Sequence, residues 1–268
     1  SIPFHLSEMA SFHNVLPPTT RRYKYEGYDQ CLRVLDQEAE RVERVEDTHE
    51  AYNPYSIMEI DEPSFLECFV KEESPLSKSW EVYDHVSQSA LLKEYSFAHA
   101  VIVGAFHRIF SAWADTSRDY IVSGYGATVR GKTLTKRPEY TWMPLGMLDI
   151  RSEWPTFVSE VVWLETSTKL QEDMKFWLDD PEGSVNAAIS ITVSEEKILV
   201  ESWARRHNSP PSPNQSIEIV RNPSAGCPRV SGHLEIEFSD VVLRDKKDGE
   251  SNFVMTPADM NELARHMW

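Results

Sequence analysis

The stretch that most constrains the fold covers residues 154–178, WPTFVSEVVWLETSTKLQEDMKFWL, which has the pattern of a strand, a short turn and an amphipathic helix. A strand alternates its side chains between two faces, so Val158, Glu160 and Val162 share one face. Glu160 is thus a carboxylate in an apolar run, and an ionised group there is costly unless it is paired or coordinated. Two interpretations follow: Glu160 is a metal-binding or catalytic acid, or it faces solvent from an edge strand.

The helix that follows supplies two further candidates. At 100° per residue, Leu170, Met174 and Trp177 lie on one buried face of this helix. Asp173 lies at the flank of that face, and Lys169 lies further along the same flank. Asp173 is therefore a candidate to support or cap a site, and Lys169 is a candidate catalytic lysine. The simpler alternative is an ordinary surface ion pair between Lys169 and Asp173, four residues apart.

Composition narrows the class of protein. The 268 residues are 41% hydrophobic, enough for one large domain or for a domain with an appended segment. The formal net charge is -16, which disfavours non-specific binding to a phosphate backbone but leaves room for a metal-dependent enzyme with a local basic groove. No uninterrupted apolar run and no charged-then-apolar leader is visible, so we expect neither a transmembrane helix nor a signal peptide. Three widely spaced cysteines predict a reducing compartment, the cytoplasm or the nucleus.

The order of predicted elements gives an α/β fold with a mixed sheet flanked by helices. We expect residues 1–78 to form an N-terminal arm and helical extension, and residues 79–268 to form the α/β core with C-terminal strands and a last helix. Within the core, helices are predicted at 79–93, at 96–114 and from 256 onwards. Strands are predicted at 119–123, 185–193, 197–203, 217–220 and 233–238.

Other residues with chemical potential surround the central stretch. His99 falls on the buried face of the 96–114 helix, where it either supports a site or is a satisfied core histidine. Glu139 follows Pro138 in a short β-prone segment. A cluster of basic residues lies beside it and either flanks a nucleic-acid groove or is simply solvated: Arg130, Lys132, Lys136 and Arg137.

Taken together, these pieces carry a family resemblance over about residues 95–203. They are a helix with His99 near its start, the Gly-x-Gly-Ala-Thr-Val turn at 124–129, and the Lys-x-Pro-acid-x-x-Trp segment at 136–142. After these come Trp-Pro-Thr-x-Val-x-Glu-Val at 154–161, Leu-x-x-Asp-x-x-x-Trp-Leu at 170–178 and a Gly-x-Val-x-x-x-Ile strand at 183–189. The block resembles a group of fungal proteins with a restriction-endonuclease-like, PD-(D/E)XK fold.

The resemblance implies a core of helix, three strands, helix and strand, and a nuclease site. Such nucleases hold Mg²⁺ on an acid from the second strand and an acid from the third, and a lysine two residues after the latter orients water. Carried over to this sequence, the acids and metal ligands are Glu139 and Glu160. The lysine position holds Val162, so Lys169 is the replacement candidate, with Asp173 and His99 in support.

Two functions remain open on the sequence. One is a Mg²⁺-dependent phosphodiesterase that hydrolyses DNA or RNA. The other is a catalytically degenerate protein of the same fold that binds a protein partner or nucleic acid. The absent strand lysine, the glutamate at position 139 where the family has aspartate, and the acidic net charge favour the second. The resemblance favours the first.

Overall fold

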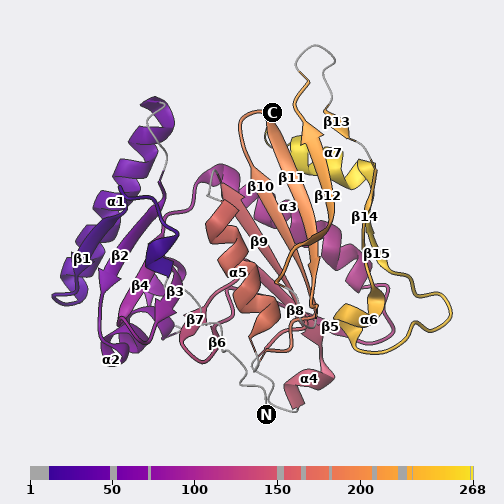
Figure 1. The fold of residues 1–268 in the computed structure, drawn as a ribbon, viewed down its shortest axis with the longest axis horizontal. Coiled ribbons are helices and arrows are strands. Elements are labelled where there is room, and N and C mark those ends of the chain that lie inside the picture. Colours follow the sequence, from indigo (N-terminus) through magenta and orange to yellow (C-terminus); the bar gives the residue numbers. More distant parts are fainter. Residues whose placement is uncertain are drawn as a thin grey trace.

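The computed structural model describes residues 12–48, 53–71, 74–149, 154–163, 167–180, 183–206, 210–222, 228–230, 232–265 and 267. Two large sheets dominate the molecule, one of six strands and one of seven, and a two-stranded sheet lies near the C-terminal end. In Figure 1 the six-stranded sheet and helix α1 lie to one side of the seven-stranded sheet. The chain therefore builds two sheet units that meet along one seam.

The six-stranded sheet has the order β1-β2-β4-β3-β7-β6. Its strands are β1 (Arg21–Lys24), β2 (Tyr55–Glu59), β3 (Trp80–Asp84), β4 (Ser89–Lys93), β6 (Val129–Arg130) and β7 (Leu134–Lys136). Helix α1 (Tyr28–Thr48) and the short helix α2 (Glu62–Phe65) accompany it, with brief helical turns at Phe12–Asn14, Leu66–Val70 and Pro75–Lys78. A shared apolar cluster that includes Cys31, Phe69 and Trp80 joins α1 to this sheet.

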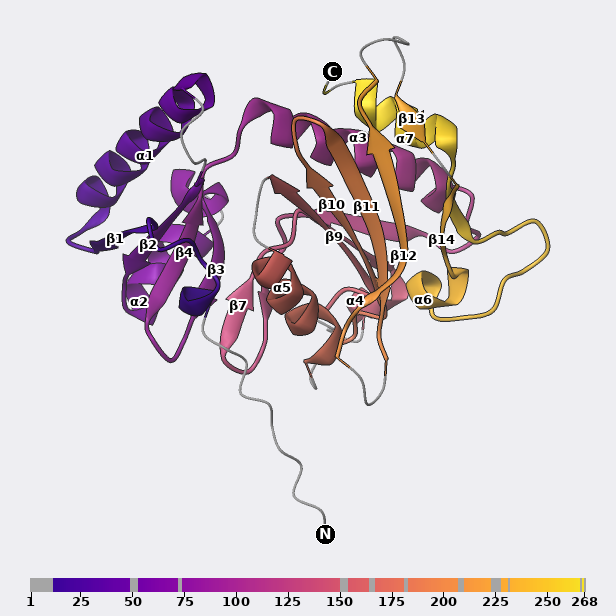
Figure 2. The ribbon, with the colours of Figure 1, turned by 45° about the horizontal axis from the view of Figure 1, so that its top comes forward.

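The seven-stranded sheet has the order β13-β12-β11-β10-β9-β8-β5. Its strands are β5 (Ile121–Tyr125), β8 (Tyr140–Pro144), β9 (Phe157–Trp163), β10 (Ala187–Val193), β11 (Lys197–Ala204), β12 (Pro213–Val220) and β13 (Arg229–Val230). Helices α3 (Phe97–Ala114) and α7 (Pro257–Arg265) cover one face, and α5 (Ser167–Asp179) covers the other (Figure 2). The short helix α4 (Gly146–Asp149) follows β8.

The alternation predicted for the central strand is confirmed. Val158 and Val162 of β9 pack in one apolar cluster with Met174 and Trp177 of α5. Phe157 and Val161, on the opposite face, pack in the cluster that contains α3. Strand β9 is therefore buried on both faces, and the edge-strand interpretation of Glu160 is wrong because β8 and β10 flank it on either side.

The predicted fold class is also confirmed. Within the seven-stranded sheet, helix α3 is followed by β5, β8 and β9, which pair antiparallel in the order β5-β8-β9, while β6 and β7 between them in sequence belong to the other sheet. Helix α5 then returns the chain so that β10 pairs parallel with β9. This is a mixed sheet flanked by helices, with the succession of helix, three strands, helix and strand. Strand β11 continues the sheet antiparallel to β10.

The C-terminal part closes one end of the seven-stranded sheet. Strands β14 (Leu234–Ile236) and β15 (Phe253–Met255) form the two-stranded sheet, with helix α6 (Phe238–Val242) between them in sequence. Their apolar residues belong to the same cluster as α3 and α7. Helix α3 is long and apolar enough, by length and composition alone, to cross a membrane, and in this fold its buried face packs on the sheet.

Two secondary-structure predictions were wrong. Residues 79–93 form the β3–β4 hairpin and not a helix, and all five residues of each strand are buried. Burial on both faces removes the polar alternation that distinguishes a strand from a helix, so the segment had no clear period. The N-terminal extension is not wholly helical either, because β1 and β2 pair parallel within it. The boundary at residue 78 stays a prediction.

Candidate functional site: a buried lysine–acid network

Glu160 lies in the middle of β9 and points toward α5. It is 7% exposed, and Trp177 of α5 donates its indole Nε1–H to Glu160 Oε1 at 2.7 Å. Burial raises the pKa of Glu160 to about 8, against the opposing effect of Lys136. Glu160 is therefore largely protonated at neutral pH, and it is hydrogen-bonded to the helix that covers it.

Glu139 lies beside Glu160, immediately before β8. Tyr140 pairs with Ser159, and continuing this register places Glu139 opposite Glu160. His99 Nε2 lies 2.8 Å from Glu139 Oε1. Burial alone would raise the pKa of Glu139, but Lys93 and His99 outweigh it and the pKa is lowered. Burial, together with Lys93, lowers the pKa of His99, so a neutral His99 donates to an ionised Glu139.

Lys93, at the end of β4, reaches Glu139 from the six-stranded sheet. Its ammonium lies 3.4 Å from Glu139 Oε1, 3.4 Å from Glu81 Oε2 and 3.4 Å from the backbone oxygen of Val161. Burial lowers the pKa of Lys93, but Glu81 and Glu139 outweigh this effect and the pKa is raised. One buried cation therefore joins acids from both sheet units.

Lys169 and Asp173 complete the network from α5. Lys169 Nζ lies 2.5 Å from Glu81 Oε1 and 2.8 Å from Asp173 Oδ2, and Asp173 Oδ1 also accepts from Lys136 of β7. The pKa of Glu81 is lowered, because Lys169 and Lys93 outweigh the effect of its burial. The surface-pair interpretation is wrong: Lys169 is 3% exposed, and Asp173 pairs with two lysines.

The buried charged residues described above form one connected group, whose positive and negative charges nearly cancel. We call it the lysine–acid network, and its members are Glu81, Lys93, His99, Lys136, Glu139, Glu160, Lys169 and Asp173. Its three lysines face three paired carboxylates, on Glu81, Glu139 and Asp173. The remaining acid, Glu160, is held largely neutral by burial. Buried charges are tolerated when they are paired in this way, so the network suits the buried seam between the two sheet units.

The network does not fit a divalent cation. Mg²⁺ takes oxygen ligands from free carboxylates, whereas here ammonium or N–H groups engage Glu139 and Glu160. Among the described residues, no group of three or more His, Cys, Asp and Glu side chains has the arrangement of a metal site. A cavity lined in part by Lys136, Lys169 and Asp173 has a volume of about 20 Å³, close to that of one water molecule. The predicted Mg²⁺ ligands are thus brought together but already engaged.

The predicted nucleic-acid-binding residues do not share one surface. Lys136 is 1% exposed and cannot contact a phosphate, which corrects that prediction. Arg137 donates Nε–H to the oxygen of Gly126 at 2.9 Å and lies over the Trp80 ring, so it holds the 124–129 turn. Gly126 has φ +59, and its missing side chain leaves the space that the Arg137 guanidinium fills.

Arg130 and Lys132 are the exposed members of the set. Arg130 pairs with Glu62 at 2.9 Å, across to helix α2. A single exposed ion pair of this kind contributes little to stability, so it does not prevent another role. Their contact with nucleic acid stays a prediction.

Sequence reasoning missed Glu81 and Lys93, which belong to the segment predicted to be a helix. The signal that could have found them was the pair of short runs WEVYD and SALLK, separated by four residues. Each run carries one or two charges among apolar residues, the two runs pair as a hairpin, and Lys93 Nζ reaches the backbone oxygen of Val161 in β9. Opposite charges in two adjacent buried strands indicate a buried pair.

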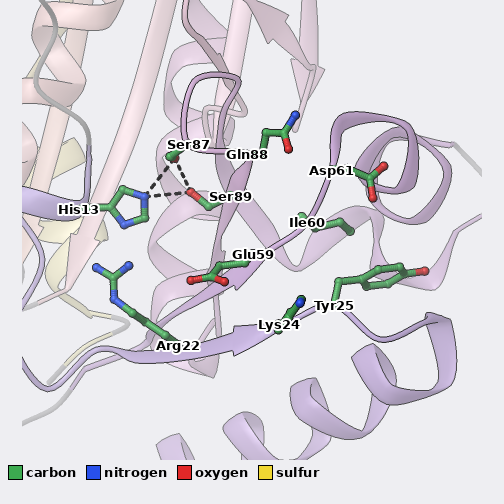
Figure 3. A pocket seen from close by; sticks show the side chains of 10 residues that line it. All are labelled: His13, Arg22, Lys24, Tyr25, Glu59, Ile60, Asp61, Ser87, Gln88 and Ser89. Carbon is green, nitrogen blue, oxygen red and sulfur yellow. Dashed lines mark hydrogen bonds between the residues drawn. The ribbon is translucent and has the colours of Figure 1, made fainter.

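A separate hollow lies on the six-stranded sheet, away from the network. Its volume is about 390 Å³, and it lies between β1, the end of β2 and the β3–β4 turn. Figure 3 shows His13 with its Nε2 directed at two hydroxyls, at 3.2 Å from Ser87 and 2.9 Å from Ser89. Basic Arg22 and Lys24 and acidic Glu59 and Asp61 share its wall, so its charge is mixed.

Comparison with known proteins gives a distant likeness to a solved structure. No family model matches the sequence, and no curated protein matches it. Among solved structures, a candidate nuclease of the DUF820 group from Anabaena variabilis is similar with a TM-score of 0.42 and 11% identity. The match covers 62% of this chain and 90% of that one. A likeness this distant carries no argument about the chemistry of the network, and the likeness to a fungal group stays a prediction.

Proposed function

We propose that this protein uses a PD-(D/E)XK nuclease-like fold for binding and not for hydrolysis. In this proposal the acids that correspond to the family's metal ligands have become structural charges between two sheets. The observation that carries it is the position of the Lys93 ammonium, 3.4 Å from both Glu81 and Glu139. A protein cation there supplies the positive charge that a metal ion supplies in an active nuclease.

Two further observations support the proposal. Metal-dependent hydrolysis needs acids that are free to bind a cation and a nearby group that orients water. Val162 stands at the lysine position of the strand and is buried in an apolar cluster. The cavity beside Lys169 and Asp173 admits about one water molecule and no nucleotide. A phosphodiester would have to displace part of the six-stranded sheet to reach Glu139 or Glu160.

The alternative is a Mg²⁺-dependent phosphodiesterase acting on DNA or RNA. The register that brings Glu139 opposite Glu160 favours it, as does the closeness of Lys169 and Asp173. It requires that Lys93 and Trp177 release the two acids. Because this separates buried partners, it carries a large free-energy cost.

For the proposed binding role, a protein partner fits the charge of this protein better than nucleic acid does. The net charge of -16 repels a phosphate backbone, and two of the four predicted basic contacts are engaged inside the fold. We also propose an intracellular location. Cys31 and Cys68 are free and buried, as expected for a reducing compartment.

The test is a cleavage assay with plasmid and single-stranded DNA and RNA in Mg²⁺ or Mn²⁺. Wild type is compared with Glu139→Gln and Glu160→Gln, and folding of each protein is checked by circular dichroism. We expect wild type to show no more metal-dependent cleavage than either variant. Cleavage by wild type that is lost in a folded Glu160→Gln protein would establish the hydrolytic alternative.

A further inference from the structure

A second group of acids surrounds a cavity at the far end of the seven-stranded sheet. The cavity has a volume of about 350 Å³ and lies between the ends of β11 and β14, the start of β12 and helix α6. In Figure 1 these elements meet at the lower end of the sheet. Its polar lining includes Ser202, Asn214, Gln215, Glu235, Glu237 and Asp240.

The three acids of this lining, which we call the acid pocket, form no direct ion pair with the described residues. Within the described ranges, no lysine, arginine or histidine lies within ion-pair distance of Glu235, Glu237 or Asp240. Asn252 instead donates Nδ2–H to Glu235 Oε1 at 2.6 Å and to Glu237 Oε2 at 2.9 Å. One amide group therefore holds two like charges together, and its Oδ1 accepts a hydrogen bond from Lys246 Nζ at 2.9 Å, so the Lys246 ammonium bonds the amide and not the two carboxylates.

A buried hydroxyl in the same lining also lacks a partner. Ser202 is 1% exposed, and its Oγ has no hydrogen-bond partner among the described residues. It lies on the same face of β11 as Val200, the face that looks toward β14. The neighbouring Gln215 is already satisfied, because its side chain bonds both the N–H and the carbonyl of Glu235. Buried polar groups are nearly always paired, so the Ser202 hydroxyl is available to a donor or acceptor beyond the described residues.

We propose that the acid pocket binds a small aliphatic diamine or polyamine. A primary ammonium group donates up to three hydrogen bonds, which suits carboxylate oxygens and a hydroxyl that has a free acceptor. A second ammonium group matches the remaining carboxylates, and the methylene chain packs on the apolar part of the wall, such as Ala187 and Ile236. A divalent metal ion is the weaker match, since the described acids do not have the arrangement of a metal site. The inference is independent of the proposed function.

The rim of the cavity limits the size of the ligand. Arg206 donates to Asn214 Oδ1 and to Ser212 Oγ, so its guanidinium is engaged beside the entrance. A bulky ligand would meet this guanidinium. Putrescine and spermidine are therefore suitable probes, and n-butylamine is the matched single-ammonium control.

Isothermal titration calorimetry on the full chain at constant ionic strength tests the proposal. We expect saturable binding of putrescine or spermidine, at least tenfold tighter than n-butylamine. Asp240→Asn, and separately Ser202→Ala, should weaken the binding, the former by tenfold or more. Glu196→Gln, which removes an exposed acid outside the lining, should leave it within twofold.

Three results would overturn the proposal. The first is an equal loss of affinity in Glu196→Gln and Asp240→Asn, which would mean attraction to net charge alone. The second is binding of Mg²⁺ or Ca²⁺ that competes with the amines at equal concentration, which would mean a metal site. The third is absence of heat with all three amines while the thermal unfolding curve shows that wild type is folded.

Discussion

Two groups of acidic residues in this protein differ in how their negative charge is neutralised. In the lysine–acid network, three lysines face the ionised carboxylates, and burial keeps Glu160 largely neutral. In the acid pocket, the amide of Asn252 holds Glu235 and Glu237, and none of the three acids forms an ion pair with a described residue. The difference follows from burial, because the side chains of the network are buried, whereas Glu237 is exposed and Glu235 and Asp240 are partly exposed. A carboxylate inside this fold is neutralised by the protein, whereas one at a cavity still attracts an external cation.

The largest effect is expected from removing the central cation of the network. Lys93→Met leaves Glu81 and Glu139 buried with less positive charge, and should lower the free energy of unfolding by about 3–5 kcal/mol. Urea denaturation followed by tryptophan fluorescence measures this. The double variant Lys93→Met, Glu139→Gln should recover part of the loss, because it removes one of the stranded charges. If Lys93→Met is within about 0.5 kcal/mol of wild type, the network is not compensated as described.

A smaller loss in the free energy of unfolding is expected at Lys136, and Arg130 is the exposed basic residue with which it is compared. Lys136→Met removes a 1% exposed ammonium from Asp173, and should cost about 2–4 kcal/mol. Arg130→Met removes an exposed guanidinium from Glu62, and should cost less than about 1 kcal/mol. The same urea experiment measures both variants. Equal losses would contradict the assignment of Lys136 to the buried network.

The smallest change in the free energy of unfolding is expected in the acid pocket, where the substitution should stabilise the protein. Burial and the charge of Glu237 raise the pKa of Asp240, so its contribution to stability is lost as pH rises through that raised pKa. Asp240→Asn should therefore stabilise the amine-free protein at pH 7, by a few tenths of a kcal/mol. Asp173→Asn is the control from the network, and it should destabilise, since it leaves two lysines with fewer partners. Thermal unfolding of both variants measures the two changes. If both variants change stability in the same direction, the two groups of acids do not differ as described.

Local sequence pattern was enough to predict the centre of the fold. The alternation around Glu160 and the helical face of Leu170, Met174 and Trp177 depend only on residues near in sequence. These short-range patterns fixed β9, α5 and the positions of Asp173 and Lys169 on the flank of the helix. The order of elements then led to the correct sheet class.

The charge partners could not be predicted in the same way. Lys93 and Glu139 are 46 residues apart, and Lys169 and Glu81 are 88 residues apart. No local period connects such pairs, and the strands that carry Glu81 and Lys93 lack polar alternation because they are buried throughout. Lys136 was assigned to a phosphate surface for the same reason: its residue type predicts exposure, and only the tertiary pairing with Asp173 explains its burial.

The protonation of Glu160 offers the most direct test of the claim that the network is structural. Its pKa of about 8 lies above the ordinary value of 4.5, so its contribution to stability is fully present below about pH 4.5 and is lost as pH rises from there to about 8. Glu160→Gln keeps an oxygen that accepts from Trp177 and cannot ionise. The measurement is the free energy of unfolding of both proteins between about pH 6.5 and about pH 9.

We predict that wild type loses stability across this range, whereas Glu160→Gln changes little and is the more stable protein at about pH 9, by on the order of 1–2 kcal/mol. The opposite result is a variant that is less stable than wild type at every pH, with parallel curves. That outcome would mean that Glu160 is ionised in the folded protein, and it would return this carboxylate to the role of a metal ligand.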